Sequence, residues 1–315
     1  MNKNMKEEFD SNVQLGAKEP QKLGRCGKEA LAELIEQAGK KKPVSGIQSG
    51  FTKLDEITDG FQGGELIVIA GMTMMGKTSL ALSMARQMAV DQHIPVMFAT
   101  YEMKETVLSK RLIAAQCDIP LQSLVCAIVN PEQWKDIEKK VEPLVASPFT
   151  VADVYEYDLN QLINLCRDKV QNDHVKAIFI DSIQYIFSDS FYGKHRLDIY
   201  ESMPALKLLA RELDIPIFIT SALSGSVFKF DDYRQRPTLS DLPDTSVIEN
   251  FSDKIIIVHR PEFYHIYQDD CGRDMRGVAI LQVEKNKGGY RGDIYLDFKE
   301  ECGKFTNQTL FKPLS

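Results

Sequence analysis

The sequence predicts an α/β domain with a mainly parallel central sheet and a β-rich C-terminal edge. Three observations lead to this fold class. From residue 64 onwards, short apolar runs alternate with longer stretches in which apolar residues recur at helical spacing. The wholly apolar runs suit strands that are buried on both faces of a parallel sheet. After residue 254 the helical patterns disappear, and only strand patterns continue.

The elements follow one another in a regular order. The apolar run Leu66–Ala70 predicts the first strand, and a helical stretch from Lys77 to about Gln92 follows it. A further helix begins at Pro131, because proline is favoured in the first turn of a helix. The remaining strands of the alternating region are predicted at 96–101, 149–153, 177–181 and 215–220. The remaining helices are predicted at 104–116, 159–170 and 206–213. The last strands are predicted at 255–259, 277–284 and 293–298, the final two joined by the Gly288-Gly289 turn.

Composition bounds the class of protein. Of the 315 residues, 43% are hydrophobic and 26% are charged, which suits a soluble chain with one large core or two modest ones. The 38 basic and 45 acidic residues give a net charge of -7, so polyanion binding would have to come from local loops. The six cysteines include no Cys-x-x-Cys pair, which argues against a zinc site and predicts reduced thiols in a cytoplasmic protein. No apolar run approaches the roughly 20 residues that cross a bilayer, and we expect no membrane partner.

Residues 1–43 are expected to precede the main domain, which we place at 44–315. Residues 1–25 are polar and indicate a flexible tail. Residues 27–40 predict a short amphipathic helix, which is too short to be stable alone. Its apolar stripe consists of Leu31, Leu34, Ile35 and Ala38. Composition leaves open whether this stripe docks on its own chain or on a neighbouring subunit.

The strongest chemical signal is the motif Gly71-x-x-x-x-Gly76-Lys77-Thr78, which lies between a predicted strand and a predicted helix. Glycines let such a loop wrap closely around phosphate oxygens at a helix N-terminus. Lys77 would reach the β- and γ-phosphates of ATP, and the Thr78 hydroxyl would ligate Mg²⁺. A glycine-rich turn without nucleotide is the alternative, and the flanking strand and helix argue against it. The expected nucleotide-binding residues of the loop are Gly71, Met72, Thr73, Met74, Met75, Gly76, Lys77, Thr78 and Ser79.

Two carboxylates follow other predicted strands. Asp181 ends the strand 177–181 and fits a Walker B carboxylate that holds magnesium through water. A strand-end aspartate that only caps a turn is the alternative. Glu102 follows the strand that ends at Tyr101, and the C-terminal ends of neighbouring parallel strands converge on one ligand crevice. A carboxylate there can polarise the water that attacks the γ-phosphate. The alternative is a solvated glutamate at a helix start.

Beyond these residues, the chain from about 44 to 310 resembles the C-terminal motor domain of the DnaB-type replicative DNA helicases, which has a RecA-like fold. Tyr101-Glu102-Met103 is similar to the Leu-Glu-Met motif that carries the family's catalytic glutamate. Asp181-Ser-Ile-Gln184 is similar to the family's Asp-Tyr-Leu-Gln motif. Further matching segments, in the family's order, are Ser49–Asp55, Thr58–Gln62, Leu206–Leu213, Arg236–Leu242, Ile248-Glu249, His259-Arg260 and Glu284–Gly288.

This resemblance implies a hexameric ring in which ATP binds between subunits and single-stranded DNA passes through the centre. It implies that Arg260 contributes to the nucleotide site, and that a loader or primase-type replication partner exists. The helix at 27–40 resembles the family's linker helix, which docks on the adjacent subunit. Only about 43 residues precede the motor region, where the family carries a collar domain.

The departures from the family pattern bear on catalysis. The family places an arginine finger in a Lys-x-Arg motif, and the matching triplet here is Lys285-Asn286-Lys287. The resemblance therefore implies catalytic roles for Lys285 and Lys287, with a lysine as the finger. Lysine supplies charge but lacks the rigid bidentate fork of arginine. Hydrolysis is expected to be weaker or differently controlled.

Two further departures lie in the predicted DNA-coupling segments. Where the family has a glutamine that links nucleotide state to DNA loops, this sequence has Ala222, and Pro243 replaces a basic residue of the DNA-contact loop. Local basic residues remain that could contact phosphates. They are Lys194, Arg196, Lys229, Arg234 and Arg236. Ordinary solvated loop charge is the alternative.

Two hypotheses follow. The first is an ATP-dependent, DnaB-like helicase motor that moves on single-stranded DNA. The second is a RecA-type ATPase that oligomerises as a regulator, loader or scaffold without unwinding. The order of the motifs favours the first hypothesis, and Ala222 and Pro243 favour the second. A recombinase-type filament protein shares the fold but accounts less well for the matches at 236–249.

Overall fold

The structure is a computed structural model. The residues it describes are 28, 31–32, 44–188, 195–196, 199–223 and 236–308. The chain divides into two compact units, Met1–Ser45 and Gly46–Ser315, and the fold below is that of the second. In the first unit, Lys28 and the pair Leu31 and Ala32 are helical and exposed. The rest of the helix expected at 27–40 lies outside the described residues.

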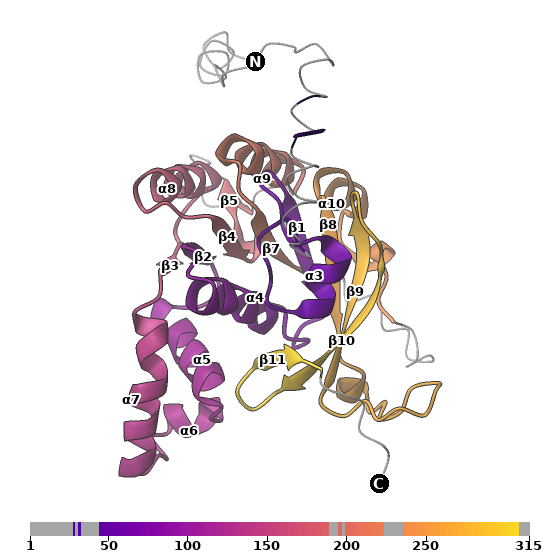
Figure 1. Ribbon diagram of the computed structural model, residues 1–315. Helices are drawn as coiled ribbons and strands as arrows, with labels where there is room; N and C mark the ends of the chain where they lie inside the picture. Colours follow the sequence, from indigo (N-terminus) through magenta and orange to yellow (C-terminus); the bar gives the residue numbers. More distant parts are fainter. Residues whose placement is uncertain are drawn as a thin grey trace. The chain divides into compact units, whose positions relative to one another are not determined.

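The second unit is built on a nine-stranded sheet in the order β11-β10-β9-β8-β1-β7-β4-β2-β3 (Figure 1). The pairs from β8 through β3 are parallel, and β9, β10 and β11 add antiparallel strands at the other edge. This arrangement confirms the predicted fold class. The strands are β1 (Leu66–Gly71), β2 (Val96–Thr100), β3 (Phe149–Asp153), β4 (Ala177–Asp181), β7 (Ile217–Ala222), β8 (Lys254–His259), β9 (Val278–Asn286), β10 (Gly292–Lys299) and β11 (Lys304–Asn307).

Helices cover both faces of the parallel region, which explains why its strands are apolar throughout. All six residues of β1 are buried, as are all five of β4. One core packs α4 (Lys77–Arg86) and α5 (Glu105–Cys117) on the sheet. The other packs α8 (Leu159–Asn172), α9 (Ile199–Leu213) and α10 (Thr245–Phe251) on the opposite face.

The first core contains a row of aromatic rings that runs across three neighbouring strands. Phe98 of β2 stacks on Phe179 of β4, with ring centroids 5.9 Å apart. Phe179 in turn stacks on Phe218 of β7 at 4.3 Å. Offset stacking of this kind adds about 0.5–1.5 kcal/mol per pair to the area that is buried. These rings hold in register the strands whose C-terminal ends carry the candidate site.

Three further α-helices belong to the unit. They are α3 (Thr52–Thr58), α6 (Leu121–Val125) and α7 (Pro131–Val145). Asn130 caps α7 by accepting a hydrogen bond from the backbone N–H of Gln133, whose side chain accepts one from the Asn130 N–H. Pro131 occupies the first turn, as expected. Helices α5, α6 and α7 form a group beside the edge strand β3 (Figure 1).

Two elements differ from expectation for identifiable reasons. Helix α9 begins at Ile199, ahead of the predicted 206, and contains Pro204. The prediction rested on the pattern from Leu206 to Leu213, whereas the helix continues through Pro204, which has no N–H to donate to the carbonyl oxygen of Tyr200. Strand β11 was not predicted, because four residues that pair only with β10 carry too short a pattern.

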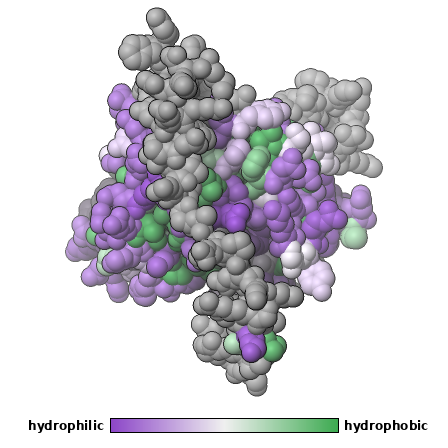
Figure 2. Space-filling view, turned by 90° about the horizontal axis from the view of Figure 1, so that it is seen from above, coloured by the Kyte–Doolittle hydropathy of each residue, from purple (hydrophilic) through white to green (hydrophobic). Residues whose placement is uncertain are grey.

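Among the residues that the structure describes, no helix is both long and apolar enough to cross a membrane. The face seen in Figure 2 is mostly hydrophilic where residues are described, with small hydrophobic patches between charged and polar ones. Such scattered apolar exposure is usual for a protein in water.

Candidate nucleotide-binding site

The loop at 71–78 connects the C-terminal end of β1 to the start of α4. Two positions of this loop require glycine, one because of its backbone conformation and one because there is no room for a side chain. Gly76, just before the helix, has φ +92°, a conformation that L-residues rarely adopt. At Gly71, an added Cβ would lie 2.9 Å from the carbonyl oxygen of Val258 on β8, which leaves no room for a side chain. The loop therefore turns tightly, as a phosphate-binding loop must.

Replacement of Gly76 by alanine is expected to destabilise the loop by about 1–2 kcal/mol, the cost of a left-handed conformation for an L-residue. The cost should be raised further because the new Cβ would lie 3.2 Å from the ring of Phe305. Urea unfolding and nucleotide binding measure the effect. Gly272→Ala is the matched control, since Gly272 has φ +75° with nothing within 4 Å of an added Cβ. Equal losses in the two variants would contradict the crowding at Gly76.

A cavity of about 940 Å³ opens over this loop, large enough for a nucleoside triphosphate. Lys77, Thr78, Glu102 and Asp181 all line it, together with residues of the C-terminal strands. The Lys77 ammonium donates a hydrogen bond to the carbonyl oxygen of Met72 at 3.0 Å. Burial lowers the pKa of Lys77, while the charges of Asp181 and Glu102 oppose that shift. The structure thus brings together the residues that the motif and the two strand ends predicted.

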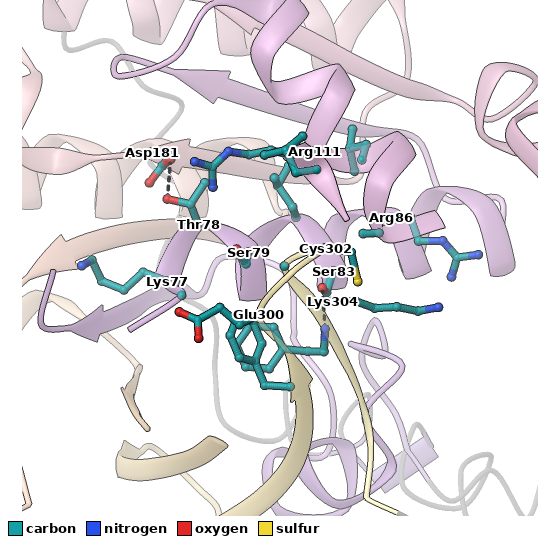
Figure 3. A pocket seen from close by; sticks show the side chains of 18 of the residues that line it. Lys77, Thr78, Ser79, Ser83, Arg86, Arg111, Asp181, Glu300, Cys302 and Lys304 are labelled. Atoms are coloured by element: carbon teal, nitrogen blue, oxygen red, sulfur yellow. Dashed lines mark hydrogen bonds between the residues drawn. The ribbon is translucent and has the colours of Figure 1, made fainter. Parts of the chain in front are cut away.

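Thr78 and Asp181 form a direct contact at the cavity floor. The Thr78 hydroxyl donates to Asp181 Oδ2 at 2.9 Å (Figure 3). The Thr220 hydroxyl of β7 donates to Oδ1 of the same carboxylate. Burial raises the pKa of Asp181, and the two hydroxyl hydrogen bonds oppose that shift. Asp181 is only 1% exposed. A buried strand-end carboxylate held in this way is positioned by its neighbours and does not merely cap a turn.

The oxygen donors of this pair suit Mg²⁺. Magnesium keeps several waters and is usually held by one or two carboxylates together with substrate phosphates. Among the described residues, no group of three or more His, Cys, Asp or Glu could hold a metal ion by itself. The site therefore fits a magnesium ion that arrives with a nucleotide.

Glu102 lies directly beyond β2, on the same edge of the sheet as Asp181. Its carboxylate accepts a hydrogen bond from the Ser182 hydroxyl at 3.3 Å. Partial desolvation at the cavity raises the pKa of Glu102, although the residue is exposed, and the negative charge of Asp181 raises it further. The Ser182 hydrogen bond and the charges of Lys77 and Arg111 oppose these shifts. A raised pKa strengthens a carboxylate as a base, which is what the activation of a water molecule requires.

Sequence reasoning missed Arg111. This residue lies on α5 and lines the cavity, and its guanidinium points toward Thr78 and Asp181 (Figure 3). Its positive charge lowers the pKa values of both Asp181 and Glu102, against the upward shifts that burial imposes. Its Nε is buried without a hydrogen-bond partner. A buried, unpaired guanidinium nitrogen in an open cavity suits an anionic ligand. No local motif marks Arg111, and only the packing of α5 places it here.

Arg260 lies just beyond β8, on the opposite side of the phosphate loop. Its guanidinium donates to the carbonyl oxygen of Met74 at 3.2 Å and pairs with Glu300 at 2.9 Å. It also lies over the ring of Phe298, 4.4 Å from the centroid. Arg260 lines the cavity, where sequence reasoning expected it, and it supports the phosphate loop from the side of β10.

Lys285 and Lys287 lie at the opposite end of the central strands from the phosphate loop. Asn286, between them, pairs with Lys254 at the start of β8, whereas the phosphate loop follows the end of β1. The two ends of a six-residue strand are about 16 Å apart. Neither lysine lines the described cavity. Within one chain they are therefore remote from the loop, and any action on a phosphate would have to be on another copy.

Of the five predicted DNA-contact residues, the structure describes Arg196 and Arg236. Lys194, Lys229 and Arg234 lie outside the described residues. Arg196 belongs to a two-residue strand, β6 (His195–Arg196), that pairs antiparallel with β5 (Phe187–Ser188). Arg236 forms an ion pair with Asp293 at the start of β10, and both side chains are partly exposed.

Comparison with known proteins places this geometry in context. A family model described as "DnaB-like helicase C terminal domain" matches residues 46–307. The replicative DNA helicase DnaB of Leifsonia xyli subsp. xyli is 29% identical over 278 residues, which are 88% of this chain and 59% of that protein. The DnaB of Treponema pallidum is 32% identical over 260 residues, 82% of this chain and 56% of that protein. The chain thus spans less than two thirds of the length of these curated relatives.

Two solved structures share the fold. One is a solved ATPase domain that is 27% identical to this chain and superposes with a TM-score of 0.80. The match covers 92% of this chain and 100% of the solved domain. A DnaB-like replicative helicase, described together with its interactions with primase, is 28% identical with a TM-score of 0.78. It covers 89% of this chain, which in turn covers 68% of that protein.

Proposed function

The chain belongs to the family of DnaB-like helicase C-terminal domains, and from that premise we propose that it hydrolyses ATP in order to move along single-stranded DNA and unwind duplex. The observation that carries the proposal is the convergence of Lys77, Thr78, Glu102 and Asp181 on one cavity. A phosphate loop alone indicates nucleotide binding. Two carboxylates add groups that hydrolysis needs. Asp181 is buried and accepts a hydrogen bond from the loop residue Thr78, and Glu102 has a raised pKa.

Each group has a distinct task in this proposal. Lys77 neutralises charge on the β- and γ-phosphates, and the loop N–H groups bind their oxygens. Thr78 and Asp181 would hold Mg²⁺, which would supply positive charge beside the phosphates. Glu102 orients and deprotonates the attacking water. Arg111 and Arg260 contribute further positive charge at the sides of the cavity.

The proposed assembly is a homo-oligomeric ring in which residues of two subunits complete each nucleotide site.

 The position of Lys285 and Lys287, at the strand ends remote from the phosphate loop, supports a site that is shared between two subunits. A hexamer is the proposed ring size. The proposed partners are single-stranded DNA and, by analogy with the solved relative described with primase, a loader or primase-type protein. A cytoplasmic location accords with this role.

The activity is expected to respond to DNA. Addition of single-stranded DNA should raise the rate of ATP hydrolysis several-fold, because a motor couples turnover to movement along its track. A colorimetric phosphate assay with and without an oligonucleotide measures this effect, and strand displacement on a forked duplex measures unwinding. The response should weaken as salt is raised, since phosphate contacts release counterions. ATP hydrolysis that ignores DNA, with no strand displacement, would remove the motor from the proposal.

A second candidate is an ATPase that oligomerises as a regulator, loader or scaffold without unwinding. Position 222 carries the observation that favours it. The Gln184 side chain reaches Ser221 Oγ at 2.9 Å and the carbonyl oxygen of Ala222 at 3.5 Å, so position 222 lies beside the Walker B segment. Ala222 lines the cavity but offers no side-chain polar group that could sense a phosphate. DNA-independent hydrolysis by an assembled oligomer would support this candidate.

A further inference from the structure

The segment that follows β4 places a buried serine beside the proposed catalytic base. We propose that Ser182 is a positioning residue, whose hydroxyl holds the Glu102 carboxylate in the orientation from which it deprotonates the attacking water. This inference rests on the proposed ATPase function. Four observations carry it: the contact between the two side chains, the absence of a competing cap bond, the rigid backbone around Ser182, and the exposure of Glu102.

The two side chains are in direct contact. The Ser182 hydroxyl donates a hydrogen bond to Glu102 Oε1 at 3.3 Å. An ionised carboxylate can only accept hydrogen bonds, and a bond to a charged acceptor is stronger than one to a neutral acceptor. The distance exceeds the usual value of about 2.7–2.8 Å for two oxygens. Hydrogen bonds of catalytic groups are often long without substrate and shorten in the reactive complex. The contact therefore favours the ionised form of Glu102, which is the form that acts as a base.

The Ser182 hydroxyl is not engaged by the turn that it precedes. Ser182 occupies the N-cap position of the 3-10 turn η2 (Ile183–Tyr185), where a serine hydroxyl commonly accepts a hydrogen bond from a backbone N–H. Within the described part of the chain its side chain makes no such cap bond. The turn closes through the backbone, because the Tyr185 N–H donates to the Ser182 carbonyl oxygen at 3.2 Å. The hydroxyl is therefore directed to the carboxylate of Glu102.

The backbone on which Ser182 lies is rigid. Ser182 is 4% exposed and directly follows β4, which pairs in parallel with β2 through all five of its residues. Beyond this pairing, the Tyr101 N–H donates to the Asp181 carbonyl oxygen at 2.7 Å. The residues just before Glu102 and just before Ser182 are thus bonded to each other. A group that orients a catalytic side chain needs a fixed position of this kind.

Glu102 is exposed and has few directional contacts. Among the described residues, the Ser182 hydroxyl is the one hydrogen-bond donor to its carboxylate. The charges of Asp181, Lys77 and Arg111 act on the carboxylate without a described hydrogen bond. An exposed glutamate has several accessible rotamers, so one directional bond can decide which of them is populated. The family motif to which this segment is similar has a tyrosine in place of the serine, so the contact is a feature of this chain.

The test compares Ser182→Ala and Ser182→Thr with the unmodified full chain. Ser182→Ala is expected to lower kcat by about 10-fold, near the lower end of what a hydrogen bond to a charged group contributes. The KM for ATP should change little, because the hydroxyl acts on the base and not on the nucleotide. Ser182→Thr retains the hydroxyl and should recover most of the rate.

Ser49→Ala is the matched control. Ser49 is also a buried serine, and its hydroxyl donates to the carboxylate of Asp55 at 2.7 Å. Neither Ser49 nor Asp55 lines the described cavity. The loss of this hydroxyl should therefore leave kcat close to that of the unmodified protein, with circular dichroism to confirm that each variant is folded.

A double variant separates positioning from a general structural effect. Glu102→Gln already lacks the base, so adding Ser182→Ala should lower its residual rate by less than about twofold. A further 10-fold loss in the double variant would show that Ser182 acts independently of Glu102 and would overturn the proposal. An unchanged kcat in Ser182→Ala, or a raised KM with an unchanged kcat, would overturn it as well.

A second readout does not depend on hydrolysis. NMR of ¹³C-labelled glutamate follows the titration of Glu102 without nucleotide or magnesium, and its signal is the one missing from Glu102→Gln. Partial desolvation and the charge of Asp181 raise the pKa of Glu102, whereas the Ser182 hydrogen bond and the charges of Lys77 and Arg111 lower it. Ser182→Ala should therefore raise this pKa. An unchanged pKa in a chain that hydrolyses ATP would overturn this inference alone, and a raised pKa in a chain without hydrolysis would overturn the proposed function.

Discussion

Replacement of Lys77 by alanine is expected to lower ATP hydrolysis by at least about 100-fold, the usual effect of removing one preorganised group that stabilises charge in a transition state. The reason is geometric. The ammonium lies in the cavity over the phosphate loop, where it donates to the Met72 carbonyl oxygen and interacts with the charges of Asp181 and Glu102. Without it, the phosphates would meet these two carboxylates with less positive charge to offset the repulsion.

Hydrolysis is measured under saturating ATP and magnesium, with circular dichroism to confirm that the variant is folded. Lys53→Ala is the matched control. Lys53 is a lysine near the start of α3 whose side chain is 72% exposed and pairs with Glu56. Its loss should leave the rate close to that of the unmodified protein, because exposed ion pairs contribute little. Normal turnover in Lys77→Ala would refute the assignment of the phosphate loop.

The second large effect is expected at Glu102. Glu102→Gln keeps the size of the side chain and removes the base, so hydrolysis should fall by about 100-fold or more while ATP binding is retained. The pH dependence gives a second readout. Glu102 must be ionised to accept a proton, and partial desolvation together with the charge of Asp181 raises its pKa. Activity is therefore expected to be present above that raised pKa and to fall at a higher pH than for an ordinary glutamate.

Glu105→Gln serves as the control for this experiment. Glu105 opens α5 only three residues further on, is exposed, and accepts a hydrogen bond from the Asp153 N–H at 3.3 Å. Its replacement should leave both the rate and the acidic limb of the pH profile in place. Loss of ATP binding in Glu102→Gln, or an unaltered rate, would show that another group activates the water.

The parallel part of the fold could be predicted because its physical cause is local. Strands buried on both faces need apolar residues at every position, and Leu66–Ala70 and Ala177–Ile180 show this directly. Strand β11 could not be predicted, since Lys304–Asn307 is stabilised by pairing with β10 and by packing on α4. The early start of α9 at Ile199 was not predicted, because the prediction rested on the pattern from Leu206 to Leu213.

In the candidate site, too, the residues that belong to local patterns could be predicted, and those placed by three-dimensional packing could not. Lys77 and Thr78 were predicted from a contiguous motif, because loop and helix start are one local unit. Asp181 and Glu102 were predicted as strand ends, since neighbouring parallel strands end at one edge. Arg111 was not, because it reaches the cavity only through the packing of α5 on the sheet. The ties of Lys285 and Lys287 to their own chain likewise appear only in three dimensions.

The phosphate loop and the β9–β10 turn lie at opposite ends of the strands of one sheet. This separation determines how many nucleotide sites the proposed assembly has for a given number of chains. In the proposed ring each chain contributes two unlike half-sites, so two chains in a row would make one whole site and leave two halves unused. An open row of any length is always one site short of its number of chains. Only a closed circle makes as many sites as chains. Specific activity per chain should accordingly rise with protein concentration and level off when the circle closes.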